Sequence, residues 1–241
     1  MMIRLPKRIT PCPLIDAVVE VRFDSSLPPD AVFGMAYGKL KETYPKVEKL
    51  PILNLPDMIR NKDPQLVFQA HYKLSDDNSV VQIGPRVLSV NSPGDYLGWE
   101  PFYRRIKQSF EAVRPLGIIK TVTRLGIRYI NFFDFDIFER INLVIRLDDK
   151  PLSAKQSTIR LELQEEEFCH LLQVANNVTV EQKPKGQRKG SVIDIDSHID
   201  GKFPNFFDQM EDLISRGHEA EKQLFFRLLK PSFLNTLNPE Y

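Results

Sequence analysis

The stretch Thr123–Asn131, "TRLGIRYIN", decides the fold that this sequence predicts. Its apolar residues alternate with polar ones, and this period of two is typical of a strand with one buried face. Arg124 and Arg128 then project from the opposite face, with Gly126 between them. A glycine inside a strand marks a bulge or a close approach by another backbone or a ligand. The stretch therefore raises the question of what the two arginines contact.

Similar alternation recurs along the chain and predicts a sheet of short strands. "AVVEVRF" at residues 17–23 is the clearest companion, because Val19, Val21 and Phe23 share one face while Glu20 and Arg22 share the other. The predicted strands cover residues 17–23, 66–74, 79–85, 86–91, 123–131, 141–147, 158–163, 168–175 and 191–199.

Apolar residues at three- and four-residue spacings predict helices within residues 25–45, 96–117 and 205–229. The last of these helices carries a buried stripe formed by Phe206, Met210, Leu213, Gly217, Ala220, Leu224 and Leu228. The fold class is therefore α+β, with a mostly antiparallel sheet covered by helices on one face.

The order of the predicted elements indicates how the chain is organised. Its 241 residues are enough for one domain with a full core, so a single domain over 1–241 is expected. Within it, residues 14–117 and 118–241 form two topologically similar halves, each closing with an amphipathic helix. No residue-level repeat accompanies this similarity.

The balance of charges limits the classes of partner that we expect for this protein. Lysine and arginine number 33 against 32 acidic residues, and the net charge of +1 gives no general attraction to nucleic acid or to an acidic membrane. Nucleic-acid binding would need a local basic patch, so another protein is the expected partner. Cys12 and Cys169 form no metal or disulfide motif, and no apolar run suits a membrane span or a signal peptide. A cytoplasmic location is expected.

Charged side chains repeat on the polar face of several predicted strands. The row consists of Glu20, Arg22, Arg124, Arg128, Arg160, Glu162, Asp194, Asp196 and His198. It could be the solvated face of the sheet, with opposite charges paired across strands for about 0.2–1 kcal/mol each. It could instead line a concave cleft in which arginines bind phosphate or carboxylate. In a third alternative the arginines form buried structural pairs with the acidic residues of the row.

No complete catalytic, metal or cofactor motif occurs in the sequence. The four histidines are scattered, no nucleophile elbow is present, and phosphate-loop and dinucleotide fingerprints are missing. Asp194 and Asp196 alone form a close acidic pair, which is weak as a magnesium signal. His218 is expected to be a structural histidine at the border of the buried stripe. Neither a cofactor nor a metal is predicted, and no residue is assigned a catalytic role.

A basic segment lies between Asn176 and Gly190. We expect a solvated hairpin loop here, or alternatively a basic finger that contacts phosphate or an acidic partner. Its basic residues are Lys183, Lys185, Arg188 and Lys189.

Three segments carry a family resemblance: "VVEVRF" near the start, "TRLGIRYIN" in the middle and "GHEAEKQLFF" in the last helix. Together they resemble a sporadically distributed family of bacterial and archaeal proteins whose function is uncharacterised. The resemblance implies an accessory protein of patchy distribution, which is usual for toxin–antitoxin, immunity and phage-defence modules. It transfers no catalytic residues.

Two functional hypotheses follow from the sequence. The first is a non-enzymatic protein-binding accessory factor in a toxin–antitoxin, immunity or phage-defence system. The alternative is nucleotide or nucleic-acid binding, or a tunnel-type phosphohydrolase, on the charged face around Glu20, Arg22, Arg124 and Arg128. Whether the protein is an enzyme stays open, and the missing catalytic constellation favours the first hypothesis.

Overall fold

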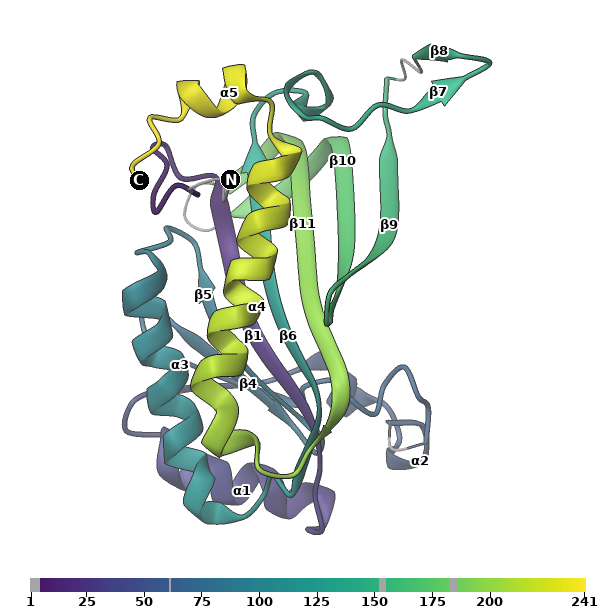
Figure 1. Cartoon of the computed structure of the whole chain (residues 1–241). Helices are drawn as coiled ribbons and strands as arrows, with labels where there is room; N and C mark the ends of the chain where they lie inside the picture. The colour runs from purple at the N-terminus through teal and green to yellow at the C-terminus, as the bar shows by residue number, and fades with distance from the viewer. Residues whose placement is uncertain (1–4, 61, 152–154, 183–185) are drawn as a thin grey trace.

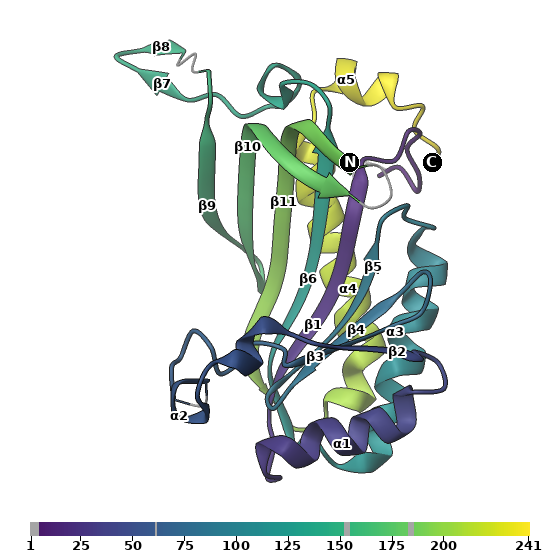
Figure 2. The ribbon, with the colours of Figure 1, turned by 180° about the vertical axis from the view of Figure 1, so that it is seen from behind.

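The computed structural model describes residues 5–60, 62–151, 155–182 and 186–241. Within these residues nine strands form one antiparallel sheet in the order β2-β3-β4-β5-β1-β6-β11-β10-β9 (Figures 1 and 2). The strands are Leu14–Asp24 (β1), Lys46–Lys49 (β2), Tyr72–Ser75 (β3), Val80–Gly84 (β4), Val87–Pro93 (β5), Thr121–Phe133 (β6), Thr158–Glu165 (β9), Phe168–Gln182 (β10) and Gly186–Phe203 (β11). The predicted α+β fold class is confirmed.

The long helices lie on one face of this sheet, as Figures 1 and 2 show from opposite sides. They are α1 (Pro29–Leu40), α3 (Trp99–Val113) and α4 (Phe206–Leu228). Shorter elements are α2 (Asp57–Arg60), α5 (Pro231–Thr236), the 3-10 turns Pro51–Asn54, Arg114–Leu116 and Ile137–Arg140, and a separate hairpin of β7 (Arg146–Leu147) and β8 (Lys150–Pro151). No helix in the described part of the chain is long and apolar enough to cross a membrane.

The centre of the sheet is the antiparallel pair of β1 and β6. Glu20 lies opposite Gly126, and Val19 lies opposite Ile127. Because side chains alternate between the faces of a strand, Val19 and Ile127 enter the core beneath the helices while Glu20 faces away from them. In α4, a Cβ on Gly217 would lie 2.4 Å from Cδ1 of Ile127, so the glycine allows the helix to approach β6 closely.

The two halves of the chain have similar topologies within the single sheet. β1 begins the first half and pairs with its last strand, β5, which is followed by α3. β6 begins the second half and pairs with its last strand, β11, which is followed by α4. The two leading strands pair with each other, and one core cluster contains Val19 of the first half and Ile127 of the second.

Three local predictions were wrong. The strand expected over 66–74 is limited to Tyr72–Ser75, because residues 66–69 follow Asp63 in successive turns closed by backbone hydrogen bonds. The strand expected over 141–147 does not join the large sheet. Asn142 there donates its side-chain amide to the carbonyls of Arg227 and Leu229 at the end of α4, which directs the chain away from the sheet.

The third wrong prediction was that of a basic loop between Asn176 and Gly190. β10 and β11 stay paired as far as Gln182 and Gly186, so most of the segment between Asn176 and Gly190 is a two-stranded extension of the sheet. Arg188 and Lys189 lie in β11, and the Arg188 guanidinium lies 4.6 Å from the ring centre of Phe132. The predicted loop residues Lys183 and Lys185 lie outside the described residues.

Candidate functional site

The predicted charged row lies on the sheet face opposite the helices. The strand register places Arg22 opposite Arg124, Arg128 opposite Asp196, and Glu20 opposite Gly126. Arg160 and Glu162 of β9 lie on this same face of the sheet. In β10 between them, Gln173 pairs with both Arg160 and Asp194, and Leu171 pairs with both Glu162 and Asp196. The sequence therefore predicted correctly which side chains share a face.

The two central arginines contact neighbouring aspartates. Nη2 of Arg124 donates to Oδ2 of Asp196 at 2.7 Å, and Arg128 donates from Nε and Nη2 to both oxygens of Asp194 at 2.8 and 2.6 Å. Gly126 leaves room for the first pair, since a Cβ there would lie 3.0 Å from Oδ1 of Asp196. The arginines of "TRLGIRYIN" thus face carboxylates of β11. The Arg124 pair is largely shielded, as in the structural alternative, whereas Arg128 is 47% exposed, as on a solvated face.

A cleft of about 750 Å³ covers another part of the row. The segment between β2 and β3 crosses the polar face of the sheet there, as Figure 2 shows, and Glu20 and Arg22 line the space beneath it. These two side chains pair with each other at 3.0 Å, and the Arg22 guanidinium lies 5.2 Å from the ring centre of Phe68. The charges in this cleft therefore neutralise one another.

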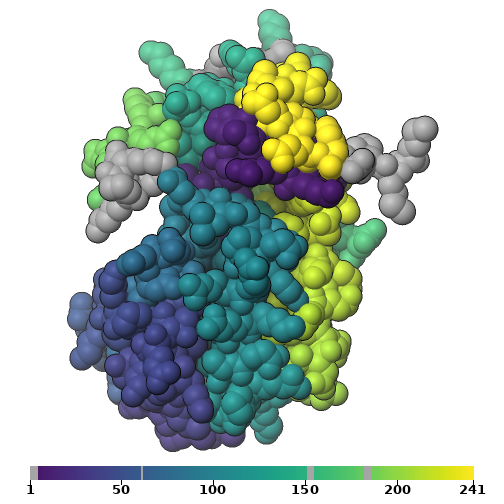
Figure 3. Space-filling view, turned by 90° about the vertical axis from the view of Figure 1, so that its left-hand side faces the viewer, coloured from purple at the N-terminus to yellow at the C-terminus, as the bar shows by residue number. Residues whose placement is uncertain are grey.

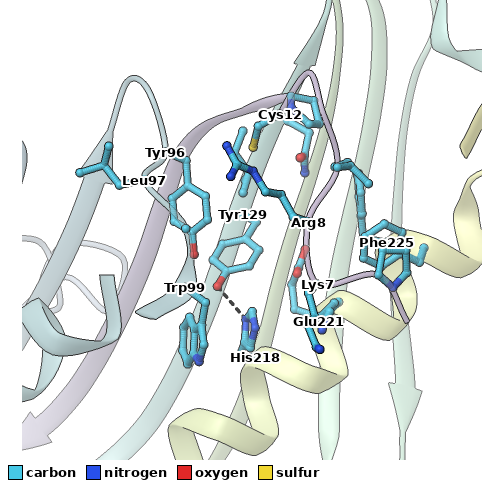
Figure 4. A pocket seen from close by; sticks show the side chains of 18 residues that line it. Lys7, Arg8, Cys12, Tyr96, Leu97, Trp99, Tyr129, His218, Glu221 and Phe225 are labelled. Carbon is cyan, nitrogen blue, oxygen red and sulfur yellow. Dashed lines mark hydrogen bonds between the residues drawn. The ribbon is translucent and has the colours of Figure 1, made fainter. Parts of the chain in front are cut away.

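The sheet's other face carries a smaller and more enclosed pocket of about 210 Å³ (Figure 4). Its walls come from the N-terminal segment, the turn before α3, strand β6 and the C-terminal half of α4. The lining residues are Pro6, Lys7, Arg8, Ile9, Cys12, Pro13, Leu14, Tyr96, Leu97, Gly98, Trp99, Tyr129, Asn131, His218, Glu221, Lys222, Phe225 and Phe226. Two of the three segments that carry the family resemblance contribute to this pocket, through Tyr129, Asn131, His218 and Glu221.

Glu221 is the most unusual side chain of the pocket. It is 1% exposed, and its Oε1 atom is buried and has no hydrogen-bond partner among the residues that the structure describes. Burial raises the pKa of its carboxyl well above the ordinary value of 4.5, and the charge of Lys222 only partly opposes this. Because buried carboxyl groups are normally paired or hydrogen-bonded, an oxygen without such a partner beside a pocket is unusual.

An aromatic wall stands beside this carboxyl. The His218 ring stacks on Trp99 with centroids 3.7 Å apart, and the Tyr129 hydroxyl lies 2.8 Å from Nδ1 of His218. Burial, followed by the charge of Lys222, lowers the pKa of His218 to about 3, so the ring is neutral at physiological pH. The hydroxyl of Tyr96 is also buried beside this pair.

The N-terminal segment closes the pocket from above. Lys7 and Thr10 donate their backbone N–H groups to the carbonyls of Glu240 and Leu237, each at 2.6 Å. Figure 3 shows the N-terminal segment, in purple, packed against the C-terminal segment, in yellow. This contact holds Lys7 and Arg8 at the pocket that Glu221 also lines (Figure 4). The wall of the pocket therefore combines a carboxyl group, cationic side chains and aromatic rings.

This site was missed at the level of sequence, although one signal was present. The buried stripe of α4 runs through Glu221 and His218, whereas the predicted stripe contained Ala220 instead. Glu221 stands four residues after Gly217 and three before Leu224, which is the helical spacing of the core-facing side. A charged residue at such a position is a candidate for a functional site.

The described residues contain no group of three or more histidine, cysteine, aspartate or glutamate side chains that could hold a metal ion. Asp194 and Asp196, the acidic pair considered for magnesium, are each bound to an arginine. Among known proteins, no family model and no curated protein matches this chain. The site is therefore interpreted from its own residues.

The Glu221 carboxyl has a predictable effect on stability. Because its pKa is raised in the folded state, folding opposes its ionisation and stability is lost as the pH rises above about 4.5. We expect Glu221→Met to raise the free energy of unfolding at neutral pH by about 1–3 kcal/mol. Urea unfolding at a series of pH values measures this gain, which should disappear below the ordinary pKa of glutamate. A gain of equal size at all pH values would mean that the carboxyl is not the cause.

Proposed function

We propose that this protein is a non-enzymatic binding protein whose pocket takes a small molecule with an ammonium group, an anionic group and an apolar body. The observation that carries the proposal is the Oε1 atom of Glu221, which is buried and unpartnered at the wall of a pocket. An ammonium group placed there would provide the missing hydrogen bond and the opposite charge.

The rest of the pocket supports this ligand class. The rings of Tyr96, Trp99 and Tyr129 line the pocket, and electron-rich ring faces suit a cation while the rings as a whole suit an apolar body. Lys7 and Arg8 also line the pocket, and they suit a carboxylate or phosphate on the same ligand. A volume of about 210 Å³ exceeds the ~150 Å³ cavity that holds benzene, so the ligand has roughly ten non-hydrogen atoms.

The setting proposed for this activity is the one that the family resemblance implies. The protein would be an accessory factor of a toxin–antitoxin, immunity or phage-defence system, and ligand binding would accompany its contact with another protein. The paired charges of the sheet's polar face give less support to the alternative of nucleotide or phosphate-ester chemistry, because Arg124 and Arg128 are already bound to carboxylates.

The proposal is tested with L-phenylalanine as probe, compared with phenethylamine, which lacks the carboxylate, and 3-phenylpropionate, which lacks the amine. Isothermal titration calorimetry should show that phenylalanine binds at least about tenfold more tightly than either half-ligand. Glu221→Gln should weaken the binding of phenylalanine and of phenethylamine by about tenfold or more, and it should leave the binding of 3-phenylpropionate unchanged. Arg8→Met should instead weaken the binding of the two compounds that carry a carboxylate, phenylalanine and 3-phenylpropionate.

Glu20→Gln serves as the matched control, since it removes a carboxylate from the cleft on the opposite face of the sheet. It should leave the binding of all three compounds unchanged. The proposal is contradicted if phenylalanine does not bind, or if Glu20→Gln rather than Glu221→Gln weakens its binding.

A further inference from the structure

Strand β9 forms one edge of the large sheet, so one side of its backbone is not paired with another strand of that sheet. It runs from Thr158 to Glu165 without a proline, and its pairing with β10 shows no bulge. Natural sheets usually protect such an edge with prolines, bulges or a covering element, because a regular free edge pairs readily with another strand. The edge of β9 is therefore ready for a strand partner.

The sequence of β9 is complementary to itself. In an antiparallel pair of two β9 strands centred on Leu161, Arg160 of each copy faces Glu162 of the other. Ile159 faces Leu163 in the same register, and Leu161 faces its own copy. Residues directly opposite each other are close enough for their side chains to interact, so this register forms two cross-strand ion pairs on one face and three apolar pairs on the other.

In the described part of a single chain these side chains make few contacts, of which one is a hydrogen bond from Sγ of Cys169 to Glu162 at 3.5 Å. Arg160 and Glu162 are exposed, and no salt bridge joins Arg160 to an acidic residue of the described chain. On the other face, Leu161 and Leu163 pack only partly against the core. Figure 1 shows α4 over β6 and β11, while β9 lies at the outer edge of the sheet, away from that helix. A second strand would cover apolar surface that the helices leave open.

We propose that β9 joins two copies of this chain into a symmetric dimer, in which the two sheets continue across an antiparallel β9–β9 pair. The same surface is used by both copies, so the contact closes on itself and forms no filament. Backbone hydrogen bonds supply much of the affinity, and the Arg160–Glu162 pairs fix the register. This inference is independent of the ligand pocket on α4.

Charge reversal tests the register without disturbing the fold, because both charged side chains are exposed. Sedimentation velocity should show a dimer of twice 27.9 kDa for the native chain. Arg160→Glu and Glu162→Arg should each weaken the dimer by about tenfold or more, since each places like charges opposite one another twice. The double variant should restore the affinity to within about threefold, because the ion pairs re-form with reversed polarity.

Glu48→Lys is the matched control, since it reverses a charge on β2, the strand at the other edge of the sheet. It should leave the dimer unchanged. Leu161→Cys, made with Cys12→Ser and Cys169→Ser, should form an intermolecular disulfide on mild oxidation, because residue 161 lies opposite its own copy. Val47→Cys on β2 in the same background should not. A monomeric native chain, a dimer sensitive to Glu48→Lys instead, or a double variant as weak as the singles would each overturn the proposal.

Discussion

Gly190→Ala is expected to cost the fold about 3 kcal/mol or more of its free energy of unfolding. Gly190 lies in β11, where a Cβ would come 2.0 Å from the carbonyl oxygen of Phe133 and 2.8 Å from the ring of Phe132. The first of these contacts is with backbone, which cannot rotate away. Relief would require β11 to move from β6 at the centre of the sheet, since Ser191 pairs with Phe133.

Gly34→Ala is the matched control for this substitution. Gly34 lies inside α1, and a Cβ there would meet no other atom within 4 Å. Because alanine has a higher helix propensity than glycine, this variant should gain about 1 kcal/mol in its free energy of unfolding. Urea unfolding followed by circular dichroism compares the two variants. A Gly190→Ala protein within about 1 kcal/mol of the native stability would contradict the close packing of β6 and β11.

Arg124→Met is expected to lower the free energy of unfolding by about 3 kcal/mol, which is the second large loss of stability that we expect. The side chains of Arg124 and Asp196 are only 15% and 21% exposed, so removing the guanidinium leaves a carboxylate largely shielded from water and without its partner. The double variant Arg124→Met with Asp196→Leu should recover most of this loss, because an apolar pair needs no compensating charge. A double-mutant cycle of thermal and urea unfolding measures the coupling.

The exposed ion pair of Arg86 and Asp24 is the control for the Arg124–Asp196 pair. Arg86 and Asp24 are 48% and 56% exposed and 3.8 Å apart. Arg86→Met should therefore cost less than about 1 kcal/mol. If Arg124→Met costs no more than Arg86→Met, the charged row is a solvated surface and its arginines remain available for a ligand.

The alternation of side chains predicted the sheet and its faces well, because a period of two follows directly from strand geometry. Val19, Val21 and Phe23 of "AVVEVRF" and Leu125, Ile127 and Tyr129 of "TRLGIRYIN" are on the helix-covered face. The pairing partners could not be predicted in the same way. That Asp196 pairs with Arg124, over Gly126, depends on β11 lying next to β6, and strand order is a property of the whole chain.

Local pattern also failed where tertiary contacts decide the conformation. Leu66, Val67 and Phe68 are apolar enough for a strand, yet Phe68 packs over Arg22 from a turn that crosses the sheet. The ligand pocket was similarly hidden, since Arg8, Tyr96 and Glu221 come from three distant segments. Only the position of Glu221 on the buried side of its helix could have drawn attention to it.

The most direct test of the proposed ligand site counts the protons released when phenylalanine binds. Burial raises the pKa of Glu221 well above its ordinary value in the empty pocket, and pairing with an ammonium group requires the carboxyl to ionise. Titration calorimetry in buffers of different ionisation enthalpy should therefore show about one proton released per phenylalanine by the native protein, and about none by Glu221→Gln. Equal proton release by the two proteins, or no binding by the native protein, would contradict a ligand site at Glu221.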